Sequence, residues 1–177
     1  MAYGSLFQWG RAADGHELIT WLNSTTGTPV NGTTATRPEE DTAANALFIT
    51  PSSANFDWRG ATQNNNLWQG VNGINNPCPD GYRLPTNAEL TTLVTASTIT
   101  NSATAASSTL KFTIPGIRDD ATGSLYSMGI RGYYWSSSVS GTYASYHNFS
   151  NGDTNTNIST RAYGYTCLLY TSDAADE

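Results

Sequence analysis

Residues 75–90 read Asn-Asn-Pro-Cys-Pro-Asp-Gly-Tyr-Arg-Leu-Pro-Thr-Asn-Ala-Glu-Leu, and no other stretch of the chain specifies its local conformation so fully. Pro77 and Pro79 each fix φ and move the preceding residue away from the helical region, so Cys78 should lie in extended or turn geometry. Asp80-Gly81 is typical of a turn. A short extended run, Tyr82-Arg83-Leu84, should follow it.

A helix is predicted directly after this run, over about 87–95. Pro85 excludes helical geometry at the residue before it. Thr86 then stands three residues before Glu89, which is the spacing of a capping box, in which each side chain binds the backbone N–H of the other residue. The apolar residues that this helix should bury, at helical spacing, are Leu90, Leu93 and Val94.

Composition limits the class of protein. A chain of 177 residues suits one domain with a sizeable core. Charged residues make up only 12% and the net charge is -6, while Gly, Ser, Thr and Asn are abundant, which is typical of a loop-rich extracellular β or α+β domain. The only lysine is Lys111 and the arginines are scattered singly, which argues against nucleic acid as a partner. No apolar run approaches the length of a membrane span, so we expect no membrane insertion.

Four tryptophans are expected to be structural, as an aromatic core under long loops in which each indole N–H needs a partner. The alternative is an aromatic platform for sugars, which we favour less because core use is commoner. The four are Trp9, Trp58, Trp68 and Trp135.

Outside this core, alternation and turn residues predict the other elements. Loops are expected over 24–38, with a hairpin tip at Asn31-Gly32, and over 97–109, while 116–123 should form a turn. Strands are predicted over 110–115, 124–129, 132–138 and 143–149.

The motif Pro-Cys-Pro-x-Gly-Tyr-Arg-Leu-Pro-Thr-x-x-Glu at 77–89 resembles the signature of the Fibrobacter succinogenes major paralogous domain, a family found mostly in Bacteroidota-type bacteria. Further matching pieces, in the family's order and reaching nearly to Thr166, are 3–11, 67–73, 132–137 and 161–165. The family is similar to the C-type-lectin-like fold of formylglycine-generating enzymes and of the variable proteins of diversity-generating retroelements. The resemblance implies an α+β, C-type-lectin-like fold, with small antiparallel sheets, one or two helices and long loops.

The resemblance also sets the expected domain limits. A single domain should span 1–166 and lack its first strand, because a Trp-Met-Asp-Arg-like segment usually precedes the residues that match 3–11. Residues 167–177 back-translate into DNA that resembles a transposon adapter used for sequencing libraries, so we interpret them as an artefact tail of a metagenomic fragment; the alternative is a genuine acidic tail. No signal peptide follows Met1 in this fragment.

In the family, the cysteine of the Pro-Cys-Pro segment would pair with one in the last strand. The matching position here falls near Leu169, and Cys167 stands two residues earlier, which preserves the strand face. We expect a free, buried Cys78; a chance approach of Cys78 and Cys167 is the alternative. Arg83 is expected to have a structural role within the same motif.

The stretch from 143 to 163 combines Tyr with Ser, Gly, Asn and Thr, which is the composition of a binding surface. It also resembles the variable region of retroelement-diversified lectin-fold proteins, where adenine-directed mutagenesis of asparagine codons yields this set of residues. The alternative is an ordinary polar meander. The predicted ligand-binding residues are Tyr143, Ser145, Tyr146, His147, Asn148, Asn151, Asp153, Asn155, Asn157, Ser159 and Tyr163.

Metal binding and catalysis are not expected, and no cofactor is predicted. Asn151-x-Asp153-x-Asn155-x-Asn157 alternates oxygen ligands, but it lacks the glycine and terminal acid of a known calcium loop, which favours a polar turn. His16 and His147 stand far apart, without paired cysteines or clustered carboxylates at ligand spacing, so His16 is interpreted as a polar loop residue. No nucleophile–base or carboxylate pair can be named. The formylglycine-generating relatives use a C-terminal cysteine pair, whereas the only cysteine before 167 is Cys78.

The leading hypothesis is therefore a secreted or cell-surface ligand-binding module, for adhesion or recognition, without catalysis, whose ligand is a protein or a glycan. Two alternatives stay open: a structural repeat domain of a surface protein with no ligand of its own, and a retroelement-diversified variable receptor. A divergent enzyme is the weakest hypothesis. The sequence does not predict an oligomeric state.

Overall fold

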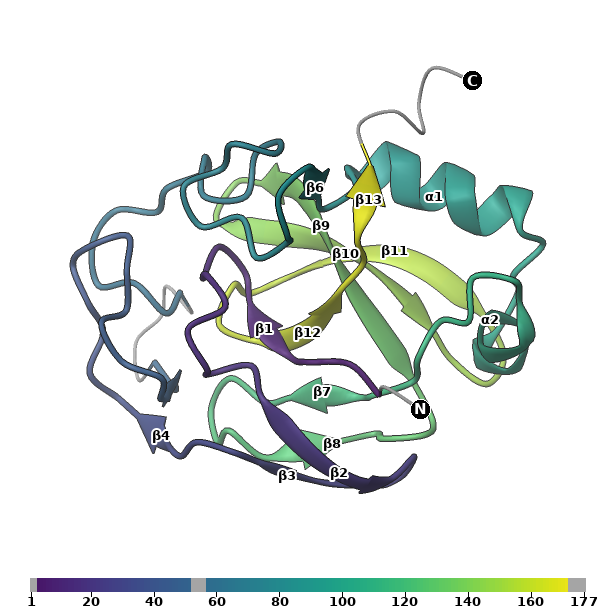
Figure 1. Cartoon of the computed structure of the whole chain (residues 1–177), viewed down its shortest axis with the longest axis horizontal. Coiled ribbons are helices and arrows are strands. Elements are labelled where there is room, and N and C mark those ends of the chain that lie inside the picture. Colours follow the sequence, from purple (N-terminus) through teal and green to yellow (C-terminus); the bar gives the residue numbers. More distant parts are fainter. Residues whose placement is uncertain (1–2, 52–56, 172–177) are drawn as a thin grey trace.

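A seven-stranded sheet forms the centre of the computed structural model, which describes residues 3–51 and 57–171 (Figure 1). Its strands are β1 (Phe7–Gln8), β7 (Ile117–Arg118), β8 (Leu125–Tyr126), β9 (Gly132–Ser140), β10 (Tyr143–Phe149), β11 (Thr154–Ser159) and β12 (Gly164–Cys167). They lie in the order β11-β10-β9-β12-β7-β8, with β1 also paired to β12. Only β9 and β12 run parallel; the other pairs are antiparallel.

Three two-stranded sheets and two helices complete the described part of the chain. The sheets are β2 (Ile19–Asn23) with β3 (Thr26–Pro29), β4 (Thr33–Thr34) with β5 (Phe48–Ile49), and β6 (Tyr82–Arg83) with β13 (Tyr170–Thr171). The helices are α1 (Asn87–Ala96) and α2 (Ser102–Ser107). This confirms the predicted α+β class. Neither helix has the length and apolar character that crossing a membrane would require.

Helix α1 begins where the sequence predicts. The Glu89 amide donates to Thr86 Oγ1 at 3.3 Å, and the Thr86 amide donates to Glu89 Oε2 at 2.7 Å, which completes the capping box. Arg83 adds two bonds to the Glu89 carboxylate, at 2.8 and 2.6 Å, and this guanidinium is the main reason why the pKa of Glu89 falls to about 2. Leu90 and Val94 are buried against β9 and β10, whereas Leu93 is half-buried.

The predicted tryptophan core is confirmed. All four side chains are at most 1% exposed, and each indole N–H donates to a backbone carbonyl. The partners are Ser136 O for Trp9 (2.9 Å), Trp9 O for Trp58 (2.8 Å), Arg11 O for Trp68 (3.1 Å) and Phe7 O for Trp135 (2.8 Å). Because the rings are enclosed and their only donors are used, these four cannot form an exposed sugar platform.

Two loop predictions are wrong. The stretch 24–38 contains β3 and β4, and its hairpin turns at Ser24-Thr25 instead of Asn31-Gly32, since Thr26 already pairs with Asn23. The stretch 97–109 contains α2. This short helix has its own capping box, in which the Asn101 and Thr104 side chains each bind the backbone N–H of the other residue.

The strand predicted over 110–115 is also wrong. These residues belong to no strand, although Phe112 is buried and its neighbours are less so, as the alternation implies. Lys111 has φ +51, a left-handed conformation that turns the chain before pairing can start. The pairing begins later, at β7, so the turn predicted over 116–123 is strand at 117–118, whereas the turn itself lies within 119–123, where the Gly123 amide donates to Asp119 O at 2.9 Å.

The two cysteines are both free and half-buried, and they pack against the same core cluster. The prediction of a free Cys78 is confirmed, although the side chain is less buried than expected. Burial raises the pKa of the Cys78 thiol to about 11, which keeps it a poor nucleophile. Of the predicted tail, Cys167 ends β12 and Tyr170–Thr171 form β13, while 172–177 lie outside the described residues.

Candidate functional site

One face of the β9–β10–β11 part of the sheet carries four of the eleven predicted binding residues, together with Tyr133, which was not predicted. The register sets Asn148 opposite both Tyr133 on β9 and Asn155 on β11, and it sets Tyr146 opposite Asn157. Residues directly opposite each other point to the same side of a sheet. These five side chains, which we call the Tyr–Asn face, line a hollow of about 500 Å³.

The two tyrosines of this face are held by a buried neighbour. Tyr165 is 4% exposed and stacks on Tyr133, with ring centroids 5.1 Å apart, and it contacts Tyr146 edge-on at 4.9 Å. Its hydroxyl lies 3.0 Å from Ser159 Oγ. Tyr163 stacks on its other side at 5.6 Å. The rings of the hollow are therefore fixed in place before any ligand arrives.

The amides of the face are only partly used. Asn157 Nδ2 donates to Asn148 Oδ1 at 3.3 Å, and Asn155 Nδ2 donates to Asp153 Oδ2 at 2.6 Å. No hydrogen bond within the described residues uses the Oδ1 atom of Asn155 or Asn157. Two carbonyl acceptors at fixed positions thus remain beside the tyrosine rings.

The rim of the hollow brings in residues that the sequence analysis did not select. Arg131, Ser150 and Gly152 line it together with Asp153. The Asp153 carboxylate is bound by Ser150 Oγ and by Asn155, and these hydrogen bonds lower the pKa of Asp153. Arg131 could have been identified from its position in the sequence, because it directly precedes β9. Ser150 and Gly152 could not, since the sequence around them indicates only a turn.

The remaining predicted residues are divided between the surface and the interior. Tyr143 and Asn151 are exposed but do not line the hollow. Ser145 and His147 are 8% and 4% exposed and lie on the opposite face, because side chains alternate along β10 and Tyr146 and Asn148 face the hollow. The four oxygen-bearing residues from 151 to 157 do not all meet, since Asn151 is absent from the hollow that the others line.

His147 is enclosed by two hydroxyls. Its Nδ1 lies 3.0 Å from Thr156 Oγ1, and its Nε2 lies 2.5 Å from Thr154 Oγ1. Burial lowers the pKa of His147 to about 4, so the ring is neutral near pH 7. In this position the side chain supports the sheet and cannot reach a ligand in the hollow.

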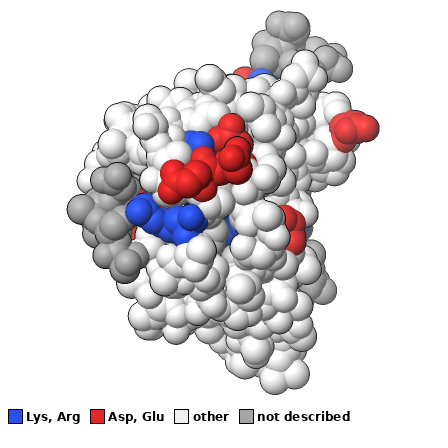
Figure 2. All heavy atoms as spheres, turned by 90° about the vertical axis from the view of Figure 1, so that its left-hand side faces the viewer, with Lys and Arg blue, Asp and Glu red and all other residues white. Residues whose placement is uncertain are grey.

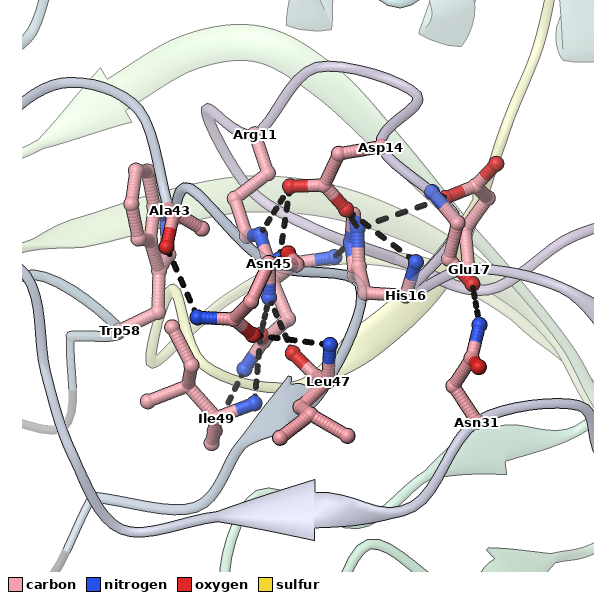
Figure 3. Close-up of polar contacts among 12 residues, drawn as sticks. Arg11, Asp14, His16, Glu17, Asn31, Ala43, Asn45, Leu47, Ile49 and Trp58 are labelled. Carbon is pink, nitrogen blue, oxygen red and sulfur yellow. Dashed lines mark hydrogen bonds and ion pairs between the residues drawn. The ribbon is translucent and has the colours of Figure 1, made fainter.

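The surroundings of His16 show that two predictions about it are wrong: that it lies in a polar loop, and that no carboxylates cluster near it. The ring is fully buried, not part of a polar loop, and its ligand atoms lie within 4.8 Å of those of Asp14 and Glu17, so clustered carboxylates are present (Figure 3). Sequence spacing alone gave no sign of this burial. The loop folds inward beneath β5, where His16 lies against Phe48 with centroids 6.4 Å apart.

The atoms of this centre already bind one another. The Gln8 amide donates to His16 Nε2 at 3.0 Å, and Nδ1 lies 2.6 Å from Asp14 Oδ1, so the neutral ring carries its proton on Nδ1. Arg11 binds the other Asp14 oxygen at 2.7 Å and holds the carbonyls of Asn45 and Leu47 at 3.0 Å each, as Figure 3 shows. With a buried guanidinium on the same carboxylate, the arrangement is a structural network.

Acidic and basic side chains lie close together on the side of the molecule that is at the left in Figure 1. Figure 2 shows acidic and basic atoms side by side in one area of that face, with mostly uncharged surface around them. Among the described residues, Arg59 and Asp41 form an ion pair, with 2.9 Å between Nη2 and Oδ1. This face therefore offers no basic patch of the kind that binds a phosphate backbone.

Comparison with known proteins identifies no relative: no family model, no curated protein and no solved structure matches the chain. The resemblance to the Fibrobacter domain family accordingly stays a prediction.

Proposed function

We propose that the chain is a non-catalytic ligand-binding domain of an exported or cell-surface protein, and that the Tyr–Asn face is its binding site. The observation that carries the proposal is the combination of two pre-positioned tyrosine rings with unused amide acceptors from the neighbouring strand, around one hollow of about 500 Å³. Rigid aromatic area and adaptable amides are what a paratope uses.

The chemistry of the hollow favours a neutral, polar ligand. Its charged groups, Arg131 and Asp153, have opposite signs, and the Asp153 carboxylate is already bound by Ser150 and Asn155. Amides provide paired donors and acceptors, which suit the hydroxyls of a glycan or the peptide groups of a polypeptide. The lining includes neither a histidine nor a cysteine, and we assign it no catalytic step.

The proposal includes a C-type-lectin-like fold. Two features support it: β1 and β12 pair, which brings the two ends of the domain together, and the motif at 77–89 forms the turn, strand and helix cap that it specifies. In such a domain the scaffold would be the tryptophan core, and the β9–β11 segment would present the ligand site.

The test uses Asn155→Ala combined with Asn157→Ala, because both side chains are exposed, so that little stability is lost. Tyr146 is a poorer target, since it packs on Tyr165. Asn72→Ala is the matched control, an exposed asparagine outside the hollow. The probes are an array of neutral cello-, xylo- and manno-oligosaccharides and an array of uncharged peptides.

We expect the wild-type chain and the control to bind a probe, and the double variant to lose at least about tenfold in affinity with an unchanged melting temperature. Undiminished binding by the double variant would place the site elsewhere. A folded wild-type chain that binds neither array would favour the structural-domain alternative.

A further inference from the structure

Strand β11 is an open edge of the central sheet. It is first in the strand order and pairs only with β10, from Ala144↔Ser159 to Phe149↔Thr154. Its four inner residues, 155–158, are exposed. Among the residues that the structure describes, none besides those of β10 forms a backbone hydrogen bond with 154–159. One row of backbone donors and acceptors therefore faces outward.

The usual protections of an edge are missing from this strand. The sequence of 154–159 is Thr-Asn-Thr-Asn-Ile-Ser, without charge, proline or glycine, and its register with β10 is unbroken. Among the described residues, one side-chain hydrogen bond joins this strand to α1, between Thr91 Oγ1 and Thr156 Oγ1 at 3.3 Å. The opposite edge, β8, is only two residues long. By these criteria β11 is a pairing surface.

We propose that β11 pairs antiparallel with β11 of a second copy of the chain, across a two-fold axis that is perpendicular to the sheet and passes between the two copies of Thr156. The partner is a second copy because the strand is self-complementary. This axis sets Asn155 opposite Asn157 on one face, and on the other face Thr156 opposite itself and Thr154 opposite Ile158. Amide–amide and Thr–Thr pairs across strands are favourable.

Charge does not oppose this pairing at the edge itself. The chain has a net charge of -6, so two copies repel each other over most approaches. The edge strand carries no charge, so the copies meet there without opposing carboxylates. A six-residue strand buries less than the roughly 1,200–2,000 Å² of a stable interface, and the dimer is accordingly weak.

The pairing would extend the proposed binding site. Asn155 and Asn157 line the hollow, so the same residues of the second copy would continue its floor and join the two hollows into one polar surface. This consequence rests on the proposed function, whereas the pairing itself does not.

Sedimentation velocity from about 10 µM to about 1 mM tests the pairing, since a small interface should associate in this range. Ile158→Lys introduces the residue that natural edges use for protection. Ile158 is half-exposed and does not line the hollow, so the ligand site stays intact. Ile74→Lys makes the same change at an exposed loop residue. We expect dimers for the wild-type chain and for the control, and at least about tenfold weaker association for Ile158→Lys.

Hydrogen exchange on the unaltered chain gives a second measurement, independent of any variant. Raising the concentration should slow the exchange of the outward amides of 154–159. A monomer at the highest concentration, equal association of Ile158→Lys and wild type, or unchanged exchange in a dimer would each overturn the proposal. Protection of the same amides by an uncharged peptide, without a dimer, would assign the edge to a foreign strand instead.

Discussion

Acidification should destabilise the chain through its two buried histidines. Burial is the main cause that lowers the pKa of His16 from 6.5 to about 4, and the same cause lowers the pKa of His147 to about 4. The geometry explains why His16 resists a second proton. Its free nitrogen, Nε2, accepts the Gln8 amide at 3.0 Å, so protonation breaks this bond and places a cation near Arg11 and Arg118.

The direction follows from linkage. Between pH 6.5 and 4 the unfolded chain binds a proton at each histidine and the folded chain does not, so stability falls as the pH drops through this window. The loss from pH 7 to 5 is about 2 kcal/mol for each histidine, or about 4 kcal/mol together. Three buried carboxyls with raised pKa values act in the opposite direction; they belong to Glu17, Asp57 and Asp120.

Urea unfolding at several pH values measures this effect, and the variants His16→Asn and His147→Gln separate the two rings from the carboxyls. Each variant should be less stable than the wild-type chain at pH 7, yet lose about 2 kcal/mol less between pH 7 and 5. The double variant should show the sum of the two differences. The two histidines thus act as controls for each other.

The result that would refute the reasoning is a difference in stability between wild type and His16→Asn that stays constant from pH 7 to 5. It would mean that His16 binds its proton equally well in the folded and unfolded chain, so that the bond from Gln8 to Nε2 does not hold the ring neutral.

Two further substitutions test the scaffold. Glu89→Ala should cost about 2 kcal/mol and lower the melting temperature by about 4–8 °C, because the helix cap and both bonds from Arg83 are lost. Glu40→Ala, at an exposed glutamate, should change the melting temperature little, and equal shifts for the two variants would contradict this account. Arg118→Met should cost about 3 kcal/mol or more in urea unfolding, because the buried guanidinium binds three backbone carbonyls at 2.8–3.0 Å; a loss below about 1 kcal/mol would show that these carbonyls find other partners.

Local interactions account for the parts of the fold that the sequence predicted. The cap of α1 depends on Thr86 and Glu89, which lie three residues apart, and the turn before it depends on Gly81, whose φ is +83. The same reasoning could have found α2, since Asn101 and Thr104 stand at capping distance. The segment is rich in Ser and Thr, which are weak helix formers, so its composition favours a loop.

The wrong predictions concern residues whose structure depends on partners that are distant in the sequence. The alternation of 110–115 describes the burial of Phe112 but not that of Leu110, which is 40% exposed; a strand also needs a neighbour, and Lys111 has a left-handed conformation that turns the chain. Strand β11 shows the reverse case. Its asparagines and threonines have no pattern of apolar alternation, and it is a strand because β10 pairs with it along its whole length. His16 likewise becomes buried through contacts with β5, far along the chain.

The placement of Ser145 and His147 bears on whether the 143–163 stretch is diversified. Both residues belong to the set that adenine-directed mutagenesis of asparagine codons produces, yet both are buried on the face opposite the hollow. His147 fits between two threonine hydroxyls, and the Ser145 carbonyl accepts a bond from Ser136 Oγ at 3.0 Å. Random replacement of a buried, hydrogen-bonded side chain such as His147 leaves neighbouring polar atoms unpaired and costs stability. The burial of these two side chains therefore argues against diversification at Ser145 and His147, and under the proposed function the 143–163 stretch would be a fixed binding surface.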